Sequence, residues 1–231
     1  MGVGHRVVHG GPQFVEPVVV DPATLAKLER YVPLAPLHQP HNLEAIRLVA
    51  AELPGVPQVA CFDTAFHRSI PEVAQLFALP PRFADAGVRR YGFHGLSFEY
   101  VASTLPGLDQ RAAGGRTVVF HLGNGASMCA MRGCSSVAKT MGFTAGIGEN
   151  QPEVRARICR DARWLGIELD EDANRAQRQC ISLPASTVAS YVIPTDEELV
   201  IGRHAERLLS CPAGGRGFRY NPGSATRPEQ Q

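Results

Sequence analysis

Three groups of polar residues occupy places in the sequence where chemistry could occur. Asp63 follows the apolar run 59–62, the loop 121–127 (HLGNGAS) follows the apolar run 117–120, and the loop 144–150 (TAGIGEN) leads into a helical pattern. In an open α/β sheet, ligands bind just beyond the carboxyl ends of the strands. Asp63 could therefore hold a metal or orient a reacting group, although a turn or a helix cap would use the same carboxylate.

Two glycine-rich loops could bind a phosphate. In residues 121–125, glycines flank Asn124, so that backbone N–H groups could form an anion-binding nest. A plain hairpin turn also uses Asn-Gly, which leaves both interpretations open. In residues 146–150, glycines precede a helix N-terminus, whose unpaired N–H groups and positive dipole end suit a nucleotide. Neither loop matches a Rossmann or a Walker A motif.

Three further side chains carry charge or can exchange a proton. Arg6 lies in a strand-like stretch that ends at two glycines, where it could clamp a carboxylate or a phosphate, or simply be exposed. His94 lies between Phe93 and a glycine, as a packed structural histidine could also do. Glu197 lies in the first turn of a helix that Thr195 is predicted to cap, and capping alone does not explain it.

Composition limits the class of protein. The 231 residues carry a net charge of +1, are 44% hydrophobic and 19% charged, and contain no apolar run long enough to span a membrane. This balance predicts a soluble globular protein that binds neither nucleic acid nor membrane. The six cysteines form no C-x-x-C pair, and without a secretory signal in the sequence they are predicted to be reduced thiols of a cytoplasmic protein.

The predicted elements alternate in a mixed α/β order. Strands are expected at 18–20, 59–62, 117–120, 127–131 and 191–193. Helices are expected after Asp21, from 43 to 53, after Ser97, after a capping box at Asn150, and after Thr195. Residues 211–231 contain almost no apolar side chains and are predicted to be a disordered tail.

Eight segments, in order along the chain, closely resemble the acetate kinase family. They are GHRVVHGG (4–11), PLAPLH (33–38), FDTAFH (62–67), RRYGFHG (89–95), HLGNGAS (121–127), MGFT (141–144), TAGIGEN (144–150) and IPTDEEL (193–199). The resemblance implies an actin-like ATPase fold of two ribonuclease-H-like domains, here incomplete. It divides the chain into a first domain (1–65, with helix 195–210 packing back on it) and a second domain (66–194).

The resemblance also implies an activity, the transfer of phosphate between ATP and acetate with Mg²⁺, and a possible homodimer. Asp63 and His94 would be catalytic, and Glu197 would help to bind Mg²⁺. Acetate or another short carboxylate would be bound by Arg6, Val8, Leu37 and Phe93. The nucleotide would be bound by His121, Gly123, Asn124, Gly125, Gly146, Ile147, Gly148, Glu149 and Asn150.

The sequence also departs from the family pattern. It begins downstream of the family's serine-rich phosphate loop, and MGFT and TAGIGEN share Thr144, where relatives have a long segment with a second catalytic Arg. Residues 137–140 (VAKT) replace the usual acidic and hydroxyl residues. Two hypotheses follow: a kinase of impaired activity, or a non-catalytic remnant that binds a ligand.

Overall fold

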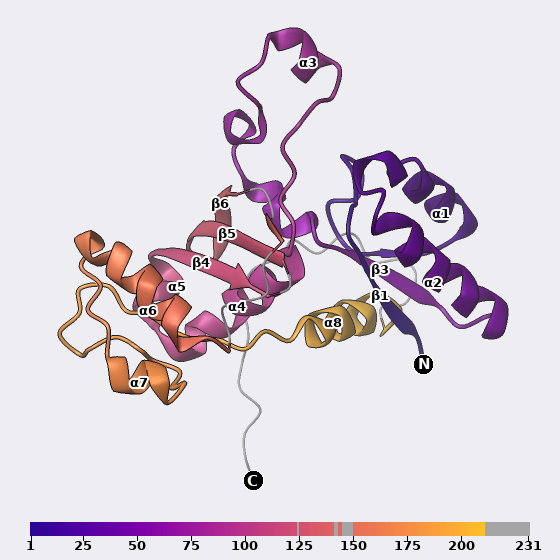
Figure 1. Ribbon diagram of the computed structural model, residues 1–231. Helices are drawn as coiled ribbons and strands as arrows, with labels where there is room; N and C mark the ends of the chain where they lie inside the picture. Colours follow the sequence, from indigo (N-terminus) through magenta and orange to yellow (C-terminus); the bar gives the residue numbers. More distant parts are fainter. Residues whose placement is uncertain (124, 141–142, 145–149, 211–231) are drawn as a thin grey trace. The chain divides into compact units, whose positions relative to one another are not determined.

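The computed structural model describes residues 1–123, 125–140, 143–144 and 150–210, and its contacts divide the chain into two units (Figure 1). The first unit comprises Met1–Val119, Met128–Gly142 and Asp196–Gln231; the second comprises Phe120–Ser127 and Phe143–Thr195. The predicted tail lies outside the described residues. The predicted boundary between residues 65 and 66 stays a prediction.

A three-stranded sheet forms the centre of the first unit. Its order is β1 (Val3–Val7), β3 (Gln58–Phe62), β2 (Val18–Val19), with β1 parallel and β2 antiparallel to the central β3. All five residues of β3 are buried, because helices cover both faces of the sheet. The continuous apolar run in the sequence is typical of such a strand.

Successive residues of β3 point to opposite faces of the sheet. Ala60 and Phe62 pack against α1 (Pro22–Glu29) and α2 (Gln39–Glu52), whereas Val59 and Cys61 pack on the side of α4 (Gly95–Leu108) and α8 (Glu197–Ser210). As the sequence predicts, Asp21 caps α1 by accepting the Thr24 N–H at 2.6 Å. The sheet therefore has a first face toward α1 and α2 and a second face toward α4 and α8.

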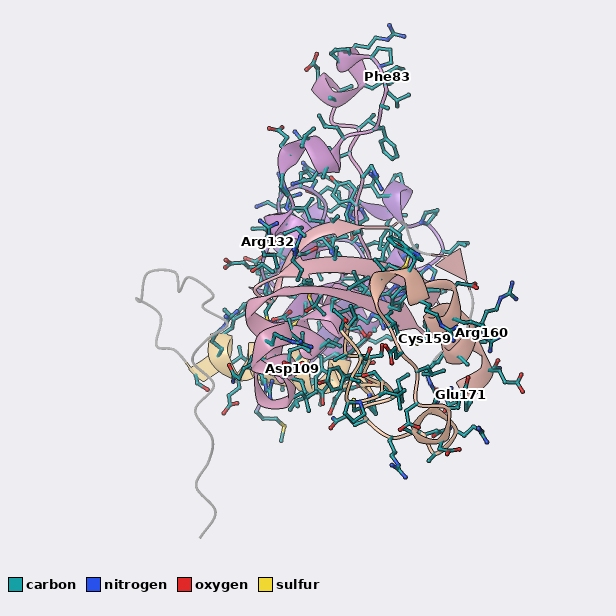
Figure 2. The ribbon with its side chains drawn as sticks, turned by 90° about the vertical axis from the view of Figure 1, so that its left-hand side faces the viewer. Phe83, Asp109, Arg132, Cys159, Arg160 and Glu171 are labelled. Atoms are coloured by element: carbon teal, nitrogen blue, oxygen red, sulfur yellow. The ribbon has the colours of Figure 1, made fainter. Side chains whose placement is uncertain are left out.

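A long excursion joins β3 to α4. It contains the 3-10 turns Ala65–Ser69 and Glu72–Gln75 and the short helix α3 (Pro81–Asp85), whose Phe83 marks its far end in Figure 2. After α4 come α5 (Gln110–Gly114) and a second sheet in the order β4 (Arg116–Leu122), β5 (Gly125–Arg132), β6 (Ser135–Lys139), with β7 (Phe143–Thr144) paired to β5. His67 Nδ1 lies 3.0 Å from Ser136 Oγ and so connects the first 3-10 turn to β6.

The second unit contains α6 (Pro152–Asp161), the 3-10 turn Arg163–Leu165 and α7 (Glu171–Arg175). Figure 2 labels Cys159 and Arg160 on α6 and Glu171 on α7. Gln151, not Asn150, is the N-cap residue of α6, and its side chain accepts no hydrogen bond from the first turn, so the predicted capping box is wrong. The predicted strand 191–193 is also wrong, since Tyr191 takes part only in an isolated bridge with Cys180. Among the described residues, no helix is long and apolar enough to cross a membrane.

Candidate functional site

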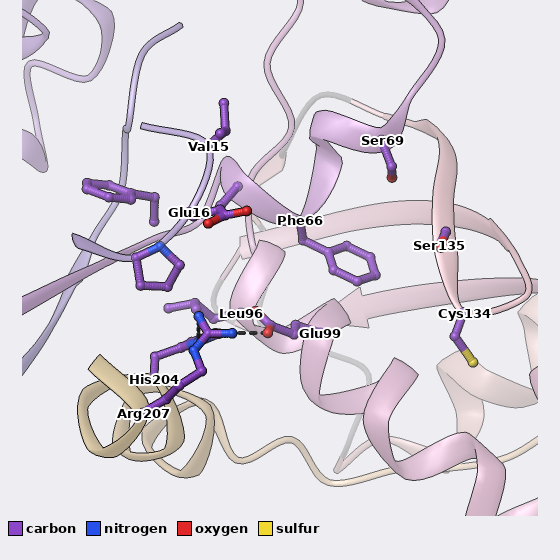
Figure 3. Close-up of a pocket in the computed structure, with 13 residues that line it drawn as sticks. Val15, Glu16, Phe66, Ser69, Leu96, Glu99, Cys134, Ser135, His204 and Arg207 are labelled. Atoms are coloured by element: carbon purple, nitrogen blue, oxygen red, sulfur yellow. Dashed lines mark hydrogen bonds and ion pairs between the residues drawn. The ribbon is translucent and has the colours of Figure 1, made fainter. Parts of the chain in front are cut away.

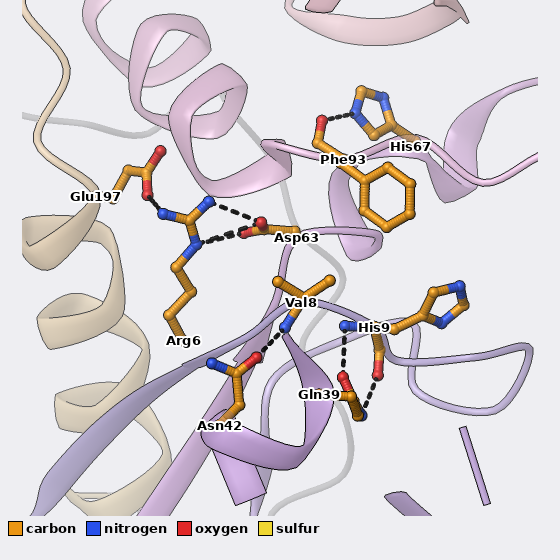
Figure 4. A network of polar contacts seen from close by, with 9 residues as sticks. All are labelled: Arg6, Val8, His9, Gln39, Asn42, Asp63, His67, Phe93 and Glu197. Carbon is orange, nitrogen blue, oxygen red and sulfur yellow. Dashed lines mark hydrogen bonds and ion pairs between the residues drawn. The ribbon is translucent and has the colours of Figure 1, made fainter. Parts of the chain in front are cut away.

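Arg6 lies between two carboxylates in the first unit (Figure 4). Its Nε donates to both oxygens of Asp63, at 3.1 and 3.2 Å, and its Nη2 donates to Oδ2 at 2.8 Å. On the other side, its Nη1 lies 2.5 Å from Glu197 Oε2. We refer to Arg6, Asp63 and Glu197 as the acid cluster.

The acid cluster forms because side chains alternate between the two faces of a strand. Arg6 is the register partner of Cys61, so both lie on the second face of the sheet, and Asp63 follows two residues after Cys61 on the same side. The Asp63 N–H donates to Val7 O at 3.1 Å and so extends the ladder by one residue. Glu197 is the first residue of α8, which packs across that face. Three segments distant in sequence thus meet at the carboxyl end of the sheet, as expected for a ligand site.

Burial raises the pKa of Asp63, while the neighbouring Arg6 acts in the opposite direction. Burial also raises the pKa of Glu197, and the like charge of Asp63 adds to that effect. Arg6 therefore holds together two carboxylates that are costly to ionise. The Arg6 side chain remains 39% exposed, and three of its N–H groups donate to the protein. A guanidinium has five N–H groups, so the contacts among the described residues leave two for a third anion.

His94 stands beside the acid cluster with a backbone that is unusual for a side-chain-bearing residue. Its φ of 58° and ψ of 28° lie in the left-handed region, and it precedes the first turn of α4. The turn allows the Gly95 N–H to donate to Asp63 O at 2.9 Å; a Cβ on Gly95 would lie 2.1 Å from that oxygen. The His94 backbone N–H also bonds the Asp63 carboxylate. Such strain persists at functional sites because the surroundings enforce it.

The structure places the three predicted pocket residues differently. Val8 directly follows β1, and its N–H donates to Asn42 Oδ1 at 3.0 Å. Phe93 is half-buried, and its carbonyl lies 3.1 Å from His67 Nε2. Leu37, by contrast, is 79% exposed. Its place in a pocket for a methyl group stays a prediction.

Sequence reasoning missed three residues that support this site. The Gln39 amide pairs with both backbone groups of His9, at 3.1 and 3.0 Å, and Asn42 holds Val8 (Figure 4). These two side chains from α2 fix the chain just beyond β1 as a neighbouring strand would. Ser97, on the first turn of α4, hydrogen-bonds to Glu197. The available signal was a pair of amides three residues apart on a helix whose other inward residues, Leu43 and Ile46, are apolar.

The predicted nucleotide residues belong to the second unit. His121 lies near the end of β4 and Gly125 begins β5, so 121–125 includes the turn between two paired strands. His121 is half-buried, and a Cβ on Gly123 would lie 2.9 Å from His121 Nε2. Asn124, Gly146, Ile147, Gly148 and Glu149 lie outside the described residues, and Asn150 is exposed. Their role in binding ATP stays a prediction.

The family model described as the Acetokinase family matches residues 1–145 and 142–203. This chain belongs to that family. It is 39% identical to the acetate kinase of Nitrobacter hamburgensis, with 90% of this chain and 75% of the relative covered. It is 40% identical to the acetate kinase of Rhodopseudomonas palustris, with 93% and 78% covered. The predicted family is confirmed.

Solved structures confirm the fold class as well. The acetate kinase of Porphyromonas gingivalis matches with a TM-score of 0.79 at 28% identity, over 90% of this chain and 78% of that one. A propionate kinase from Francisella tularensis matches with a TM-score of 0.81 at 24% identity, over 89% and 79%. The described elements therefore form part of the actin-like ATPase fold.

The comparisons also locate the difference between this chain and its relatives. The two matched segments meet at residues 142–145, around the shared Thr144. The alignment with the Nitrobacter protein extends over 304 positions, whereas 90% of this 231-residue chain is about 208 residues. About 96 aligned positions thus have no counterpart here. A long segment of the relatives is absent inside the matched region.

Proposed function

We propose that this acetokinase binds a short carboxylate, with acetate as the first candidate, and transfers phosphate between it and ATP much more slowly than an ordinary kinase. The observation that supports this proposal is the acid cluster. Arg6 is fixed in position by two carboxylates yet keeps two N–H groups for another anion. A guanidinium fixed in this way suits bidentate recognition of a carboxylate.

The residue types suit the chemistry. In the forward direction, a carboxylate oxygen of the substrate attacks the terminal phosphorus of ATP, the bond to the bridging oxygen breaks, and ADP departs. The nucleophile is already an anion, so no general base is needed. The protein must reduce the repulsion between two anions and stabilise the charge on the phosphoryl group. We assign the first task to Arg6 and the second to His94, with Val8 and Phe93 beside the acyl group.

The acid cluster also fits the way in which proteins hold Mg²⁺, through one or two carboxylates together with substrate phosphates. Glu197, with Asp63 beside it, would hold the ion. No group of three or more metal-binding side chains occurs in the described parts of the chain, so the phosphates and water would complete the coordination. When bound, Mg²⁺ would neutralise charge on the transferring phosphate.

The slow rate is inferred from the internal gap. In relatives, by the resemblance described above, the missing segment carries a second Arg at the reacting phosphate. Loss of one preorganised charge commonly costs about 10²–10³ in rate. The same gap favours the second candidate function, which is binding of a carboxylate without turnover.

A coupled assay for ADP, run with acetate, propionate and butyrate, tests the proposal. We expect carboxylate-dependent turnover far below the ~1–100 per second of ordinary kinases, and its loss in Asp63→Asn. Turnover at ordinary rates would contradict the inferred impairment. Turnover that does not depend on Asp63 would contradict the site, and saturable carboxylate binding with no turnover would select the second candidate.

A further inference from the structure

Lys139, the last residue of β6, is attached to the loop that carries Phe93 and His94. Its Nζ donates to Arg90 O at 2.9 Å, and Arg90 Nη2 lies 3.5 Å from Lys139 O. Its alkyl chain covers Gly92, where a Cβ would lie 2.2 Å from Lys139 Cδ. Lys139 belongs to the stretch 137–140 that departs from the family pattern, and the proposed phosphate transfer gives it no role.

One cation lies next to Lys139, the guanidinium of Arg90, which faces it from the loop. The His67 imidazole on the first 3-10 turn and the Cys129 thiol on β5 also face it, and burial favours the neutral form of both. In the part of the chain that the structure describes, neither Lys139 nor Arg90 forms an ion pair with a carboxylate. Two neighbouring cations without a carboxylate form a place where a phosphate-bearing molecule would be attracted.

The same surroundings favour a neutral amine. Burial, and after it the positive charge of Arg90, lower the pKa of Lys139 to about 8. A neutral amine can donate one N–H to Arg90 O and still keep its lone pair for attack. Desolvation beside another cation is a known way of making a lysine nucleophilic.

We propose that Lys139 is an acylation site, whose ε-amine takes the acyl group from a short acyl phosphate attracted by Arg90 and Lys139. The amine lone pair attacks the carbonyl carbon, and the bond from that carbon to the phosphate oxygen breaks. Inorganic phosphate leaves with the bonding electrons, and the amine gives up a proton. The products are an amide on Lys139 and free phosphate. The inference rests on the proposed function only for its source of acyl phosphate, the product of the forward reaction.

The reaction would change the site that supplies the acyl group. Acetylation removes the positive charge of Lys139, although the remaining amide N–H could still donate to Arg90 O. The loop leading to His94 would then border one cation instead of two. Accumulated acyl phosphate would thus alter the charge beside the residue assigned to the phosphoryl group.

The chain contains its own control, because its only other lysine is Lys27. Lys27 is exposed on α1. We would incubate the purified chain with acetyl phosphate at pH 7.5 and quantify acetylation of both lysines by peptide mass spectrometry. A lower pKa leaves more amine neutral but also weakens its nucleophilicity, as it does for thiols. The net expectation is that Lys139 reacts about tenfold faster than Lys27.

Two further measurements separate acyl-phosphate recruitment from simple amine reactivity. Inorganic phosphate should slow acetylation of Lys139 by acetyl phosphate, but not its acetylation by acetic anhydride, which carries no charge. With acetyl phosphate, Arg90→Gln should reduce the ratio of the acetylation rates of Lys139 and Lys27 toward one. Unfolding the chain in urea should reduce this ratio toward one with either reagent. The variant Lys139→Arg, which has no ε-amine at this position, gives the background signal of the mass-spectrometric measurement.

Equal or slower acetylation of Lys139 in the folded chain would overturn the proposal. An unchanged ratio in Arg90→Gln, with the variant folded as shown by its melt, would overturn the role of the cation pair. Because acetyl phosphate is supplied directly, the outcome does not depend on turnover. Acetylation from acetyl phosphate but not from ATP and acetate would count against the proposed phosphotransfer alone.

Discussion

Two arginines, one exposed and one buried, use the same side chain in opposite ways. In the first unit, Arg6 lies between the carboxylates of Asp63 and Glu197. In the second unit, Arg155 is 7% exposed and donates to the neutral Asn174, through Nε to Oδ1 at 2.9 Å and through Nη2 to the backbone oxygen at 3.0 Å. Asn174 in turn donates to Pro152 O at 2.8 Å, which joins α7 to the start of α6.

The difference separates contacts that hold the fold from contacts that, in the proposed function, are kept for a ligand. Around Arg155, the guanidinium donates to two neutral oxygens of Asn174 at 2.9 and 3.0 Å, and these two contacts join α6 to α7 without a charge on the acceptor. Around Arg6, burial raises the pKa of both carboxylates, so the ionised cluster costs stability at neutral pH. Natural proteins tolerate such costs mainly where function requires them.

Acidification should produce the largest difference between the two regions. His9 and His67 are buried in the first unit, and burial lowers the pKa of each from 6.5 to about 4. As pH falls below 6.5, both histidines become protonated in the unfolded chain while they stay neutral in the folded one. Protonation thus stabilises the unfolded chain, and the stability that the folded protein has at pH 7 is lost between pH 6.5 and 4. The loss is up to about 3 kcal/mol for each histidine.

Hydrogen exchange at pH 7 and pH 4.5 measures this effect by region. Protection should fall in β1 and β3 and remain unchanged in α6. Equal loss in both regions would show that the buried histidines do not set the pH response. The variant His41→Gln, at an exposed histidine on α2, serves as the control.

Removal of Arg155 should have the next largest effect. Arg155→Met keeps the length of the side chain but leaves the Asn174 groups without their donor, at a cost of about 2–3 kcal/mol. The matched control is Arg157→Met on the same helix, where the side chain is 83% exposed and its ion pair with Asp161 is long, at 4.0 Å. Urea denaturation should separate the two variants. Equal midpoints would mean that Arg155 contributes no more than a surface residue.

Replacing one carboxylate of the acid cluster with a neutral side chain should change stability only slightly, and it should raise the free energy of unfolding where removal of Arg155 lowers it. Because the folded pKa of Asp63 is raised, its contribution to stability is complete below the unfolded pKa and is lost as pH rises through the folded value. At pH 7, the free energy of unfolding of Asp63→Asn should therefore equal that of the wild type or exceed it by up to about 1 kcal/mol. Arg6 would still form its ion pair with Glu197 in this variant.

Thermal melts at pH 7 and pH 4 test this sign. The gain in melting temperature of Asp63→Asn should be smaller at pH 4 than at pH 7. The control variant Glu198→Gln, at the residue after Glu197, should show no gain at either pH. A loss of several kcal/mol in Asp63→Asn at pH 7 would show that the acid cluster supports the fold instead of a ligand.

The sequence predicted the acid cluster better than it predicted the second unit. Arg6 and Asp63 lie on or beside strands, whose period of two fixes the face of each side chain, and short motifs marked both residues. Two of the predictions that failed depend on single hydrogen bonds at helix ends. Glu197 was expected to follow a Thr195 cap, but Asp196 accepts the Leu199 N–H at 2.8 Å instead. Nothing local distinguishes Thr195 from Asp196, or Asn150 from Gln151, because each pair offers two neighbouring polar residues able to begin a helix.

Gln39 and Asn42 show a second limit of sequence reasoning. Both side chains bind backbone groups just beyond β1, at sequence separations of 34 residues for Asn42 and 30 residues for Gln39. The helical pattern of α2 could be read from its apolar residues. The partner of a buried amide could not, because it depends on how α2 packs against the sheet.

The most direct test of the central claim is carboxylate binding by Arg6→Lys compared with the wild type. Lysine keeps the positive charge between Asp63 and Glu197 but loses the planar pair of donors that a carboxylate needs. Titration with ¹³C-labelled acetate, followed by NMR, should show saturable binding to the wild type and binding weakened about tenfold or more in Arg6→Lys, since hydrogen bonds to charged groups contribute ~1.5–3 kcal/mol. The melting temperatures should stay close. Equal acetate binding by the two proteins would contradict the account, because Arg6 would then be holding only its own neighbours.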